Sequence, residues 1–400
     1  MSDTESTSDI GRGQLRMPKS SGILFCGGGT GGHVLPGLAV AAALRKRGEH
    51  GFRWIGDPVR IEATLVPKAG IALLPFGLSR PRPHSPRWLL ASIGQAWGCF
   101  RELRRSPPRV VVALGGYAAL LPGLLAPLLG RPLLVMEQNA KSGRTNRLLA
   151  RFAQAVVTQF PEARRGLPVS RVSQLGNPVR PISFRRRGHS AQLTVLVAGG
   201  SLAASTLNDL VVQAATSLSD LAHLKIIHLA GEKDQVRVAE QYRAAGIDAE
   251  VMGFCNEMPE LYQRVDVAIT RAGATTVAEL CAAGIPAFYI PLPWAADDHQ
   301  TANAQAVCRV GGAVVLPQGT TTPAMLAARL RMLVSDRALV ERMGLAARAL
   351  ARPDAAAEVA ALVQSLDRRH RRSAKRERRV AARRQNCMVF MESERIAHDH

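Results

Sequence analysis

The segment Ile23–Pro36, with the sequence ILFCGGGTGGHVLP, constrains the fold more strongly than any other part of the chain. A short apolar run enters a loop with five glycines, and apolar residues then recur at helical spacing from Val34 to Leu44. This pattern predicts a buried strand, a glycine loop and a helix. Glycines let the backbone approach a ligand closely, and the N–H groups at a helix start favour negative charge. The loop is therefore a candidate diphosphate or sugar-diphosphate site, although neither the P-loop nor the dinucleotide fingerprint is complete.

His33 lies where this loop becomes the helix, so an imidazole would stand beside whatever the loop binds. That placement makes His33 a candidate general base. A tight glycine turn with a surface histidine would give the same pattern. The segment alone therefore leaves a purely structural role open.

Short apolar runs and amphipathic stretches alternate along most of the chain, which is typical of α/β proteins with parallel sheets. Asp57-Pro58 has the pattern of an N-cap followed by a first-turn proline, and predicts a helix that continues to about Lys68. The basic, non-periodic stretch 181–190 indicates a linker. After it, Gly199-Gly200-Ser201 repeats the strand, glycine turn and helix plan, so we expect two halves of the same nucleotide-binding type.

The net charge of +21 points to an anionic partner, such as nucleic acid, an acidic membrane surface or a phosphorylated substrate. Much of this charge is local, because residues 368–384 hold ten Lys or Arg and one Glu. No nucleic-acid recognition motif accompanies it, which disfavours a nucleic-acid-binding protein. The six cysteines lack metal-type spacing, and the first twenty residues lack the apolar core of a signal peptide. These features predict a cytoplasmic protein without a structural metal.

Two segments bear on membrane contact. The uncharged stretch Val110–Gly130 has the hydropathy of a span, but its glycines and prolines divide it into a strand, a turn and a short helix. A basic, proline-rich loop at 77–84 leads into a helix that carries Trp88 and Trp97 together with several arginines. This helix could rest on an anionic membrane surface or pack its aromatic stripe against the sheet, and the sequence leaves both open.

Polar groups follow three predicted strands, at the edge where open α/β sheets bind ligands. Glu137-Gln138-Asn139 ends one strand. The segment 270–279 passes through small residues into a helix with Glu279, whose carboxylate could accept two hydrogen bonds from a ribose diol. A glutamate favoured only by the helix dipole is the alternative. The amide and hydroxyl groups of 297–303 suit sugar hydroxyls, and a metal site there is disfavoured.

Together these motifs resemble the MurG family of peptidoglycan N-acetylglucosaminyltransferases, in order and in approximate spacing, over residues 20–366. The motifs are Gly28–His33 with Pro36–Ala39, Gly115–Tyr117, Glu137–Asn139, Gly176–Arg180, Gly199–Ser201, Arg271–Ala274 with Glu279, and His299–Thr301. The resemblance implies an α/β GT-B fold, in which two Rossmann-like parallel-sheet domains face across a cleft. It also implies an inverting transfer of GlcNAc from UDP-GlcNAc to the muramyl 4-hydroxyl of lipid I, which forms lipid II.

The resemblance further implies roles for individual residues. His33 would be the catalytic base, Glu279 would hold the ribose, and Cys255 would contact uracil through its backbone. The implied substrate-binding set also contains Arg180, Ser201, Thr275 and Thr276 around uracil and diphosphate, Asn139 and Gln300 around GlcNAc, Tyr117 toward the acceptor, and Thr30, Gly31, Gly32, Ala274, Val277 and Ala278 at the two helix starts. Neither a metal nor another cofactor is implied.

The implied organisation assigns residues 21–180, completed by helix 352–366, to acceptor and membrane binding, and residues 191–351 to UDP-GlcNAc. Residues 1–20 and the basic tail 367–400 are expected to be disordered. The expected partners are UDP-GlcNAc, lipid I, an anionic membrane surface and other cell-wall synthesis proteins. The protein is expected to be peripheral, at the cytoplasmic face of the cell inner membrane, and to serve peptidoglycan synthesis, cell shape and cell division.

Two loops depart from the family's usual pattern. Leu202-Ala203 replaces an amide residue and a glycine after the second glycine turn, and Ala118–Leu121 replaces small polar residues and a Gly-Pro after Tyr117. The first departure supports one alternative, a catalytically idle relative that binds nucleotide sugar. A UDP-GlcNAc 2-epimerase on the same fold is a second alternative, but that chemistry calls for further carboxylates in the cleft.

Overall fold

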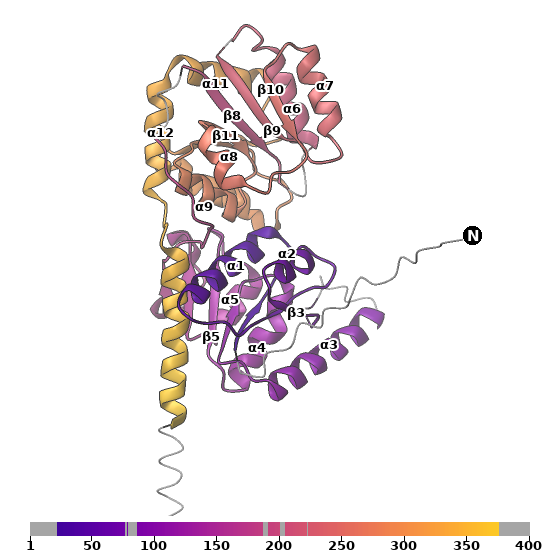
Figure 1. The fold of residues 1–400 in the computed structure, drawn as a ribbon, viewed down its shortest axis with the longest axis vertical. Coiled ribbons are helices and arrows are strands. Elements are labelled where there is room, and N and C mark those ends of the chain that lie inside the picture. The colour runs from indigo at the N-terminus through magenta and orange to yellow at the C-terminus, as the bar shows by residue number, and fades with distance from the viewer. Residues whose placement is uncertain are drawn as a thin grey trace, which may run out of the picture.

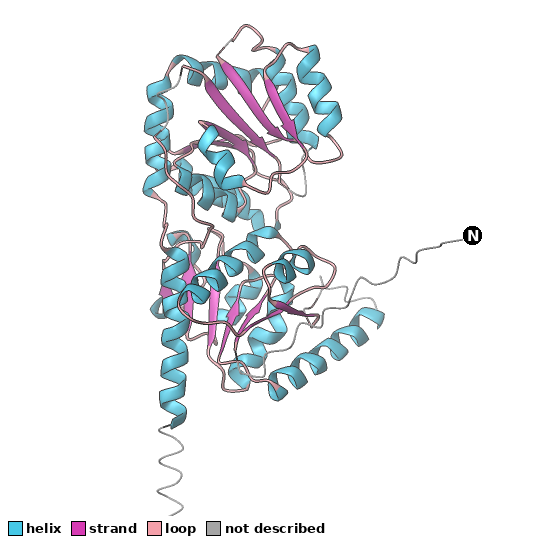
Figure 2. Cartoon of the chain, in the orientation of Figure 1, coloured by secondary structure: helices cyan, strands magenta, loops and turns pink. Residues whose placement is uncertain are grey.

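The computed structural model describes residues 22–76, 78, 86–186, 191–200, 205–221 and 223–375. Within them the chain forms two α/β domains, one above the other in Figure 1, each built on one parallel sheet. Figure 2 shows the strands inside each domain with helices around them. The predicted fold class is therefore confirmed.

The first domain has a seven-stranded sheet in the order β3-β2-β1-β4-β5-β6-β7. Strands β1, β2, β4 and β5 are buried along their whole length, as expected for parallel strands with helices on both faces. Its elements are β1 (Ile23–Cys26), α1 (Gly31–Lys46), β2 (Phe52–Ile55), α2 (Glu62–Lys68), β3 (Ala72–Leu74), α3 (Pro86–Arg105), β4 (Val110–Ala113), η1 (Tyr117–Ala119), α4 (Leu120–Leu128), β5 (Leu133–Glu137), α5 (Arg144–Ala150), β6 (Ala155–Thr158), η2 (Pro161–Arg164), η3 (Val169–Arg171) and β7 (Val172–Ser173).

The second domain has a six-stranded sheet in the order β10-β9-β8-β11-β12-β13. Its elements are β8 (Leu193–Ala198), α6 (Ser205–Thr216), β9 (Leu224–Leu229), α7 (Gln235–Ala244), β10 (Ala249–Met252), α8 (Met258–Arg264), β11 (Val267–Thr270), α9 (Ala274–Ala283), β12 (Ala287–Tyr289), η4 (Ala296–Asp298), α10 (His299–Cys308), β13 (Ala313–Val315), α11 (Pro323–Ser335) and α12 (Arg337–Ala349). The repeated strand–turn–helix plan of the sequence thus corresponds to two sheets.

Helices cover both faces of each sheet. In the first domain, Ile23 and Phe25 point into the core shared with α1, while Leu24 and Cys26 point into the core shared with α3, α4 and α5. In the second domain, α6, α7, α11 and α12 share one core, and α8, α9 and α10 share the other. Alternate residues of one strand therefore supply the two cores of its domain.

The chain returns to the first domain through a last helix at residues 355–375, yellow in Figure 1. Val359, Val363 and Leu366 lie in the core that contains β1 and α1. Arg109 donates a hydrogen bond to Asp367 at 2.8 Å, which holds the helix beyond residue 366. The expectation of a helix at 352–366 followed by a disordered tail is thus corrected: residues 367–375 are helical. Residues 1–20 and the rest of the tail lie outside the described residues.

Two expected helix starts are also corrected. Helix α1 begins at Gly31 rather than Val34, which places His33 in its first turn. Helix α2 begins at Glu62 rather than Pro58, because the Asp57 carboxylate accepts a hydrogen bond from the Val59 N–H at 3.0 Å and forms a local turn.

The uncharged stretch at 110–130 divides into β4, η1 and α4, as its glycines and prolines predict. In the part of the chain that the structure describes, no helix is both long and apolar enough to cross a membrane.

The strand order marks one candidate ligand-binding edge in each domain. In the first sheet the order reverses between β1 and β4, and in the second between β8 and β11. Open α/β sheets bind ligands at such switch points, beyond the carboxyl ends of the strands. The loops at these positions are the glycine-rich segments after β1, β4 and β8 and the small-residue turn after β11. The topology therefore selects the loops that the sequence also singled out.

Candidate active site

The glycine loop after β1 is organised by a buried carboxylate. Glu62, fully buried at the start of α2, accepts hydrogen bonds from the N–H groups of Gly29 at 2.9 Å and Asp57 at 3.0 Å. A Cβ on Gly28 would lie 1.9 Å from Glu62 Oε1, so only glycine allows this approach. Sequence reasoning missed Glu62, and no local pattern marks it, since its partner Gly29 is 33 residues away.

The imidazole of His33 is oriented by this loop. His33 Nδ1 lies 3.1 Å from the carbonyl oxygen of Gly28. A carbonyl only accepts, so Nδ1 carries the proton and Nε2 carries the lone pair in the neutral ring. Nε2 points along the neighbouring turn, because a Cβ on Gly115 would lie 3.2 Å from it. The half-buried ring can therefore accept a proton through Nε2.

The pKa of His33 is lowered to about 4, mainly by burial and to a smaller extent by the nearby His299, although the hydrogen bond to Gly28 opposes this change. His299 opens α10 in the second domain, and Thr275 of that domain lies 3.4 Å from the carbonyl oxygen of Gly32, so His33 lies at the boundary between the domains. Because the pKa lies far below 7, the ring is neutral near pH 7 and its base form is available.

Two helix N-termini meet at this boundary. Helix α1 starts at Gly31 and helix α9 at Ala274, and Thr275 Oγ1 lies 3.4 Å from the carbonyl oxygen of Gly32. Figure 1 shows α9 directly above α1. Neither first turn holds an acidic residue, and within the described residues no side chain caps either helix. The partial positive charges of both helices therefore favour an anion between them.

Glu279 lies in α9, one to two turns beyond this boundary, and is nearly buried. Its Oε2 accepts a hydrogen bond from Tyr262 at 2.9 Å, and its Oε1 lies 3.7 Å from the guanidinium of Arg180. Burial raises the pKa of Glu279, whereas Arg180 and the Tyr262 hydroxyl lower it. Arg180 also donates to the carbonyl oxygen of Asn256 at 3.1 Å, beside Cys255. The structure thus brings three of the predicted donor-site residues together.

Asn303 joins the two domains. Its amide oxygen accepts from the N–H of Ala140 at 2.7 Å, and its amide nitrogen donates to Asn139 Oδ1 at 3.1 Å and to the Ala272 carbonyl at 3.0 Å. Asn303 is fully buried, and every atom of its amide is used. The sequence marked its segment for sugar hydroxyls, but this side chain positions Asn139 instead.

The segment after β5 is held by the buried carboxylate of Glu137. It accepts hydrogen bonds from the N–H of Asn139 at 3.0 Å, the N–H of Gly143 at 2.9 Å and the amide of Asn146 at 2.9 Å. Burial raises the pKa of Glu137, and these hydrogen bonds oppose the rise. Glu137 therefore shapes the loop that presents Asn139.

The other predicted binding residues occupy varied surroundings. Tyr117 begins η1 and is 45% exposed, so its ring is open to solvent beside the glycine turn. Gln300 accepts a hydrogen bond from the Leu292 N–H at 3.0 Å through its own amide oxygen. Val277 is buried in a core, which leaves its backbone as the part that could reach a ligand. Ser201 lies outside the described residues.

A resident metal ion has no evident set of ligands here. Among the residues that the structure describes, no three His, Cys, Asp or Glu side chains lie close enough together to hold one. The residues at the domain boundary supply imidazole, carboxylate, guanidinium, amide, hydroxyl and N–H groups, which suit a nucleotide sugar and a hydroxyl acceptor.

Comparisons with known proteins agree with this geometry. Residues 23–158 match the N-terminal domain of glycosyltransferase family 28, and residues 194–359 match its C-terminal domain. A UDP-N-acetylglucosamine--N-acetylmuramyl-(pentapeptide) pyrophosphoryl-undecaprenol N-acetylglucosamine transferase from Bordetella petrii is 41% identical over 363 residues, which cover 87% of this chain and 98% of that protein.

Two solved structures are similar to this chain over most of its length. MurG from Acinetobacter baumannii is 33% identical, with a TM-score of 0.73 and coverage of 86% of this chain and 99% of that one. A UDP-N-acetylglucosamine 2-epimerase from Listeria monocytogenes has a TM-score of 0.63 over 86% of this chain and 96% of that one, but at 11% identity it shows a common fold alone. The chain therefore belongs to glycosyltransferase family 28, has the GT-B fold of that family, and is a member of its MurG group of N-acetylglucosamine transferases.

Proposed function

We propose that the protein transfers GlcNAc from UDP-GlcNAc to the muramyl 4-hydroxyl of lipid I, with inversion at the anomeric carbon, and so forms lipid II. The observation that carries this proposal is the placement of His33. Its unprotonated Nε2 lies at the domain boundary, beside two helix N-termini that favour an anion.

The mechanism follows from these positions. His33 Nε2 takes the proton of the acceptor hydroxyl as that oxygen forms a bond to the anomeric carbon of GlcNAc. The bond between that carbon and the UDP oxygen breaks, and the leaving diphosphate carries the electron pair. The N–H groups and dipoles at the starts of α1 and α9 stabilise its charge. The proton ends on His33 and the negative charge on UDP.

The second domain supplies the donor site in this proposal, and the first supplies the acceptor site. Glu279 holds the ribose diol, Cys255 contacts uracil through its backbone, and Arg180 stands beside both. In the free protein the Arg180–Glu279 contact is long, at 3.7 Å, so a ribose hydroxyl can replace it. Thr275, Thr276 and Ser201 belong to the diphosphate site, Asn139 and Gln300 to the GlcNAc site, and Tyr117 to the acceptor.

Helix α3 supports a peripheral position at an anionic membrane surface, at the cytoplasmic face of the inner membrane. Leu90, Ile93 and Trp97 are 59–70% exposed and lie on one side of the helix, while Cys99 and Leu103 on the other side are buried in the core. One side of the helix therefore packs on the core of its domain, and the apolar residues on the other side support the membrane contact that we propose. Figure 1 places it on the outside of the first domain, away from the second domain.

Vesicle sedimentation tests the membrane proposal. Anionic vesicles should retain the native chain, and a triple Leu90→Ser, Ile93→Ser, Trp97→Ser variant should bind less at low salt. Val236→Ser removes an exposed apolar residue from the second domain and serves as the control. Equal sedimentation of the native and triple-variant chains would show that these residues of α3 do not contribute to membrane binding.

Transfer of labelled GlcNAc from UDP-GlcNAc to a soluble lipid I analogue tests the reaction itself. The native chain should form a disaccharide product and release UDP in equal amounts. If it binds UDP-GlcNAc and makes no product on any such analogue, the idle relative becomes the better description. Release of an epimerised sugar nucleotide without any acceptor would favour the 2-epimerase.

A further inference from the structure

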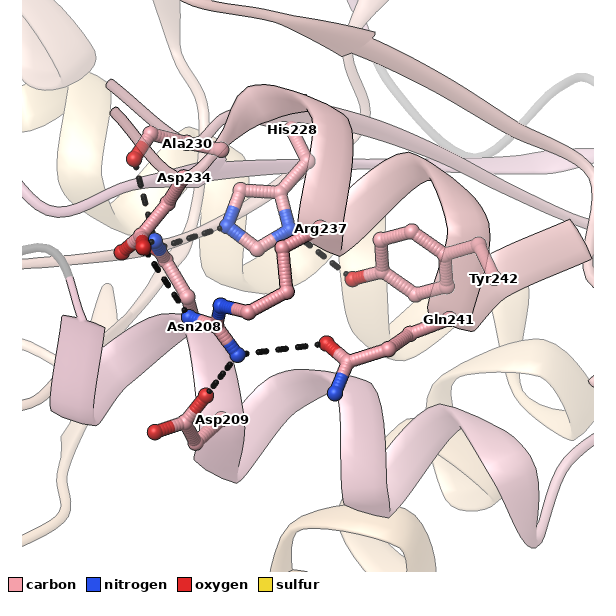
Figure 3. A network of polar contacts seen from close by, with 8 residues as sticks. All are labelled: Asn208, Asp209, His228, Ala230, Asp234, Arg237, Gln241 and Tyr242. Carbon is pink, nitrogen blue, oxygen red and sulfur yellow. Dashed lines mark hydrogen bonds and ion pairs between the residues drawn. The ribbon is translucent and has the colours of Figure 1, made fainter. Parts of the chain in front are cut away.

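A buried chain of polar side chains lies in the second domain, apart from the residues assigned above. Figure 3 shows its members: Asn208 from α6, His228 from the end of β9, and Tyr242 from α7. All three side chains are at most 2% exposed. Buried polar groups are costly unless their hydrogen bonds are complete, so their arrangement calls for a reason.

The direction of each hydrogen bond follows from the partners. The Asn208 amide nitrogen donates to the Ala230 carbonyl and to the Asp234 carboxylate, both at 3.0 Å, which leaves its oxygen as an acceptor. His228 Nε2 lies 2.9 Å from that oxygen and therefore carries the proton. Nδ1 of the neutral ring then accepts from the Tyr242 hydroxyl at 2.9 Å. The chain is fully satisfied in one arrangement, with His228 neutral.

The far end of this chain reaches the first turn of α6. Asp234 accepts a hydrogen bond from the Ser205 side chain, which holds the pKa of Asp234 down, and it pairs with Arg237 at 3.2 Å. Ser205 is the first residue of α6, and Asn208 follows one turn later. The network therefore ties the start of α6 to the loop between β9 and α7.

The start of α6 follows the carboxyl end of β8, at the edge of the sheet to which the proposed function assigns the donor. It follows β8 and Gly199-Gly200, and β8 is one of the two strands at the switch point of the second sheet. Thr270 Oγ1 donates to the Ala198 carbonyl at 2.7 Å, so the ends of β8 and β11 are held together. The first turns of α6 and α9 thus follow two adjoining strand ends, and α9 is the helix to which the proposed function assigns the diphosphate.

We propose that Asn208, His228 and Tyr242 are positioning residues for nucleotide-sugar binding, which hold the first turn of α6 against the β9–α7 loop so that it meets the diphosphate of the donor. This inference rests on the proposed function for the identity of that donor. The three residues touch no substrate and act through the position of α6.

The test compares Asn208→Asp with a control of similar burial. Asn208→Asp keeps the shape and one oxygen, but it loses both donated hydrogen bonds and faces the Asp234 carboxylate. Asp266→Asn is the control, since Asp266 is 2% exposed, accepts from the Thr194 N–H at 3.0 Å, and lies at the amino end of β11, the edge opposite the donor. Both variants should lower the melting temperature.

The deciding measurements are UDP binding by titration calorimetry and the two KM values of the transfer reaction. Asn208→Asp should raise the Kd for UDP and the KM for UDP-GlcNAc by about tenfold, the effect of one lost hydrogen bond to a charged group, and leave the KM for the lipid I analogue unchanged. Asp266→Asn should leave all three values unchanged. If Asn208→Asp fails to fold, Tyr242→Phe decides, because it removes only the hydroxyl and should raise the same two values in the same direction.

An unchanged Kd for UDP in every variant that folds would overturn the proposal and leave the network a role in stability alone. Equal increases in both KM values would also overturn it. A native chain that binds UDP but transfers no sugar would refute the proposed function, while the Kd comparison would still decide the role of the network. A native chain that does not bind UDP would refute both.

Discussion

The pH dependence of transfer is a direct test of His33, because its pKa is lowered to about 4 by burial. A lowered pKa means that the neutral, proton-accepting form persists to lower pH. At pH 5.5 a group with a pKa of 4 is about 3% protonated, whereas an unperturbed histidine with a pKa of 6.5 is about 90% protonated. Protonation of His33 should therefore lower the transfer rate by only a few per cent between pH 7.5 and 5.5.

The assay is kcat/KM across that range, since this ratio reports the ionisations of the free enzyme. The native chain should show no acid limb from His33 above pH 5.5, and His33→Ala should lower kcat by about a hundredfold or more through loss of the base. His50→Ala, which removes an exposed histidine of the same domain, should change neither kcat nor the pH profile of kcat/KM. A tenfold fall from pH 7.5 to 5.5 that disappears in His33→Ala would contradict the low pKa, and an active His33→Ala would refute the assignment of the base.

Three further predictions concern buried polar groups. Glu62→Gln should lower the free energy of unfolding by about 2 kcal/mol and lower kcat, because an amide cannot accept from both Gly29 and Asp57. Urea unfolding and transfer rates measure the two effects, and a variant with the stability and kcat of the native chain would refute the prediction. Asn303→Ala should raise the KM for UDP-GlcNAc at least severalfold, since Asn139 and Ala140 lose their shared hydrogen-bond partner. An unchanged KM would show that Asn139 does not need the hydrogen bond from Asn303. His228 has a pKa of about 3 when folded and about 6.5 when unfolded, so its contribution to stability is complete above pH 6.5 and is lost as the pH falls toward 3. Between pH 6.5 and 5 the free energy of unfolding should fall by about 2 kcal/mol more in the native chain than in a folded His228→Gln variant. Equal decreases in urea titrations of the two chains would show that protonation of His228 is not coupled to stability.

Local pattern predicted the strands, the glycine turns and most helices, because apolar spacing and glycine content act over a few residues. The start of the helix after Asp57 is the main feature that the local pattern predicts wrongly. Asp57 forms a turn with Val59, and the carboxylate of Glu62 binds the N–H of Asp57, so α2 starts four residues later than predicted. Competing side-chain bonds decided this helix start, and propensity alone does not rank them.

The site was predicted in part. The two helix starts do meet across the domain boundary, where Thr275 lies 3.4 Å from the carbonyl oxygen of Gly32, the residue before His33, and Arg180 does meet Glu279. The predictions for Ser201 fall outside the described residues. Glu62 was missed, although it shapes the glycine loop, because a glutamate at a helix start is ordinary in sequence.

The sequence by itself determined the class of fold, the two glycine-turn crevices and the family, since these depend on local backbone requirements and on motifs that lie in order along the chain. Only the tertiary structure decided which polar groups are partners. Asn303 meets Ala140 across 163 residues, and the tautomers of His33 and His228 follow from neighbours that chain folding brings to them. The physical reason is that a hydrogen bond needs two groups within about 3 Å, and strand order and domain packing, rather than local pattern, set that distance.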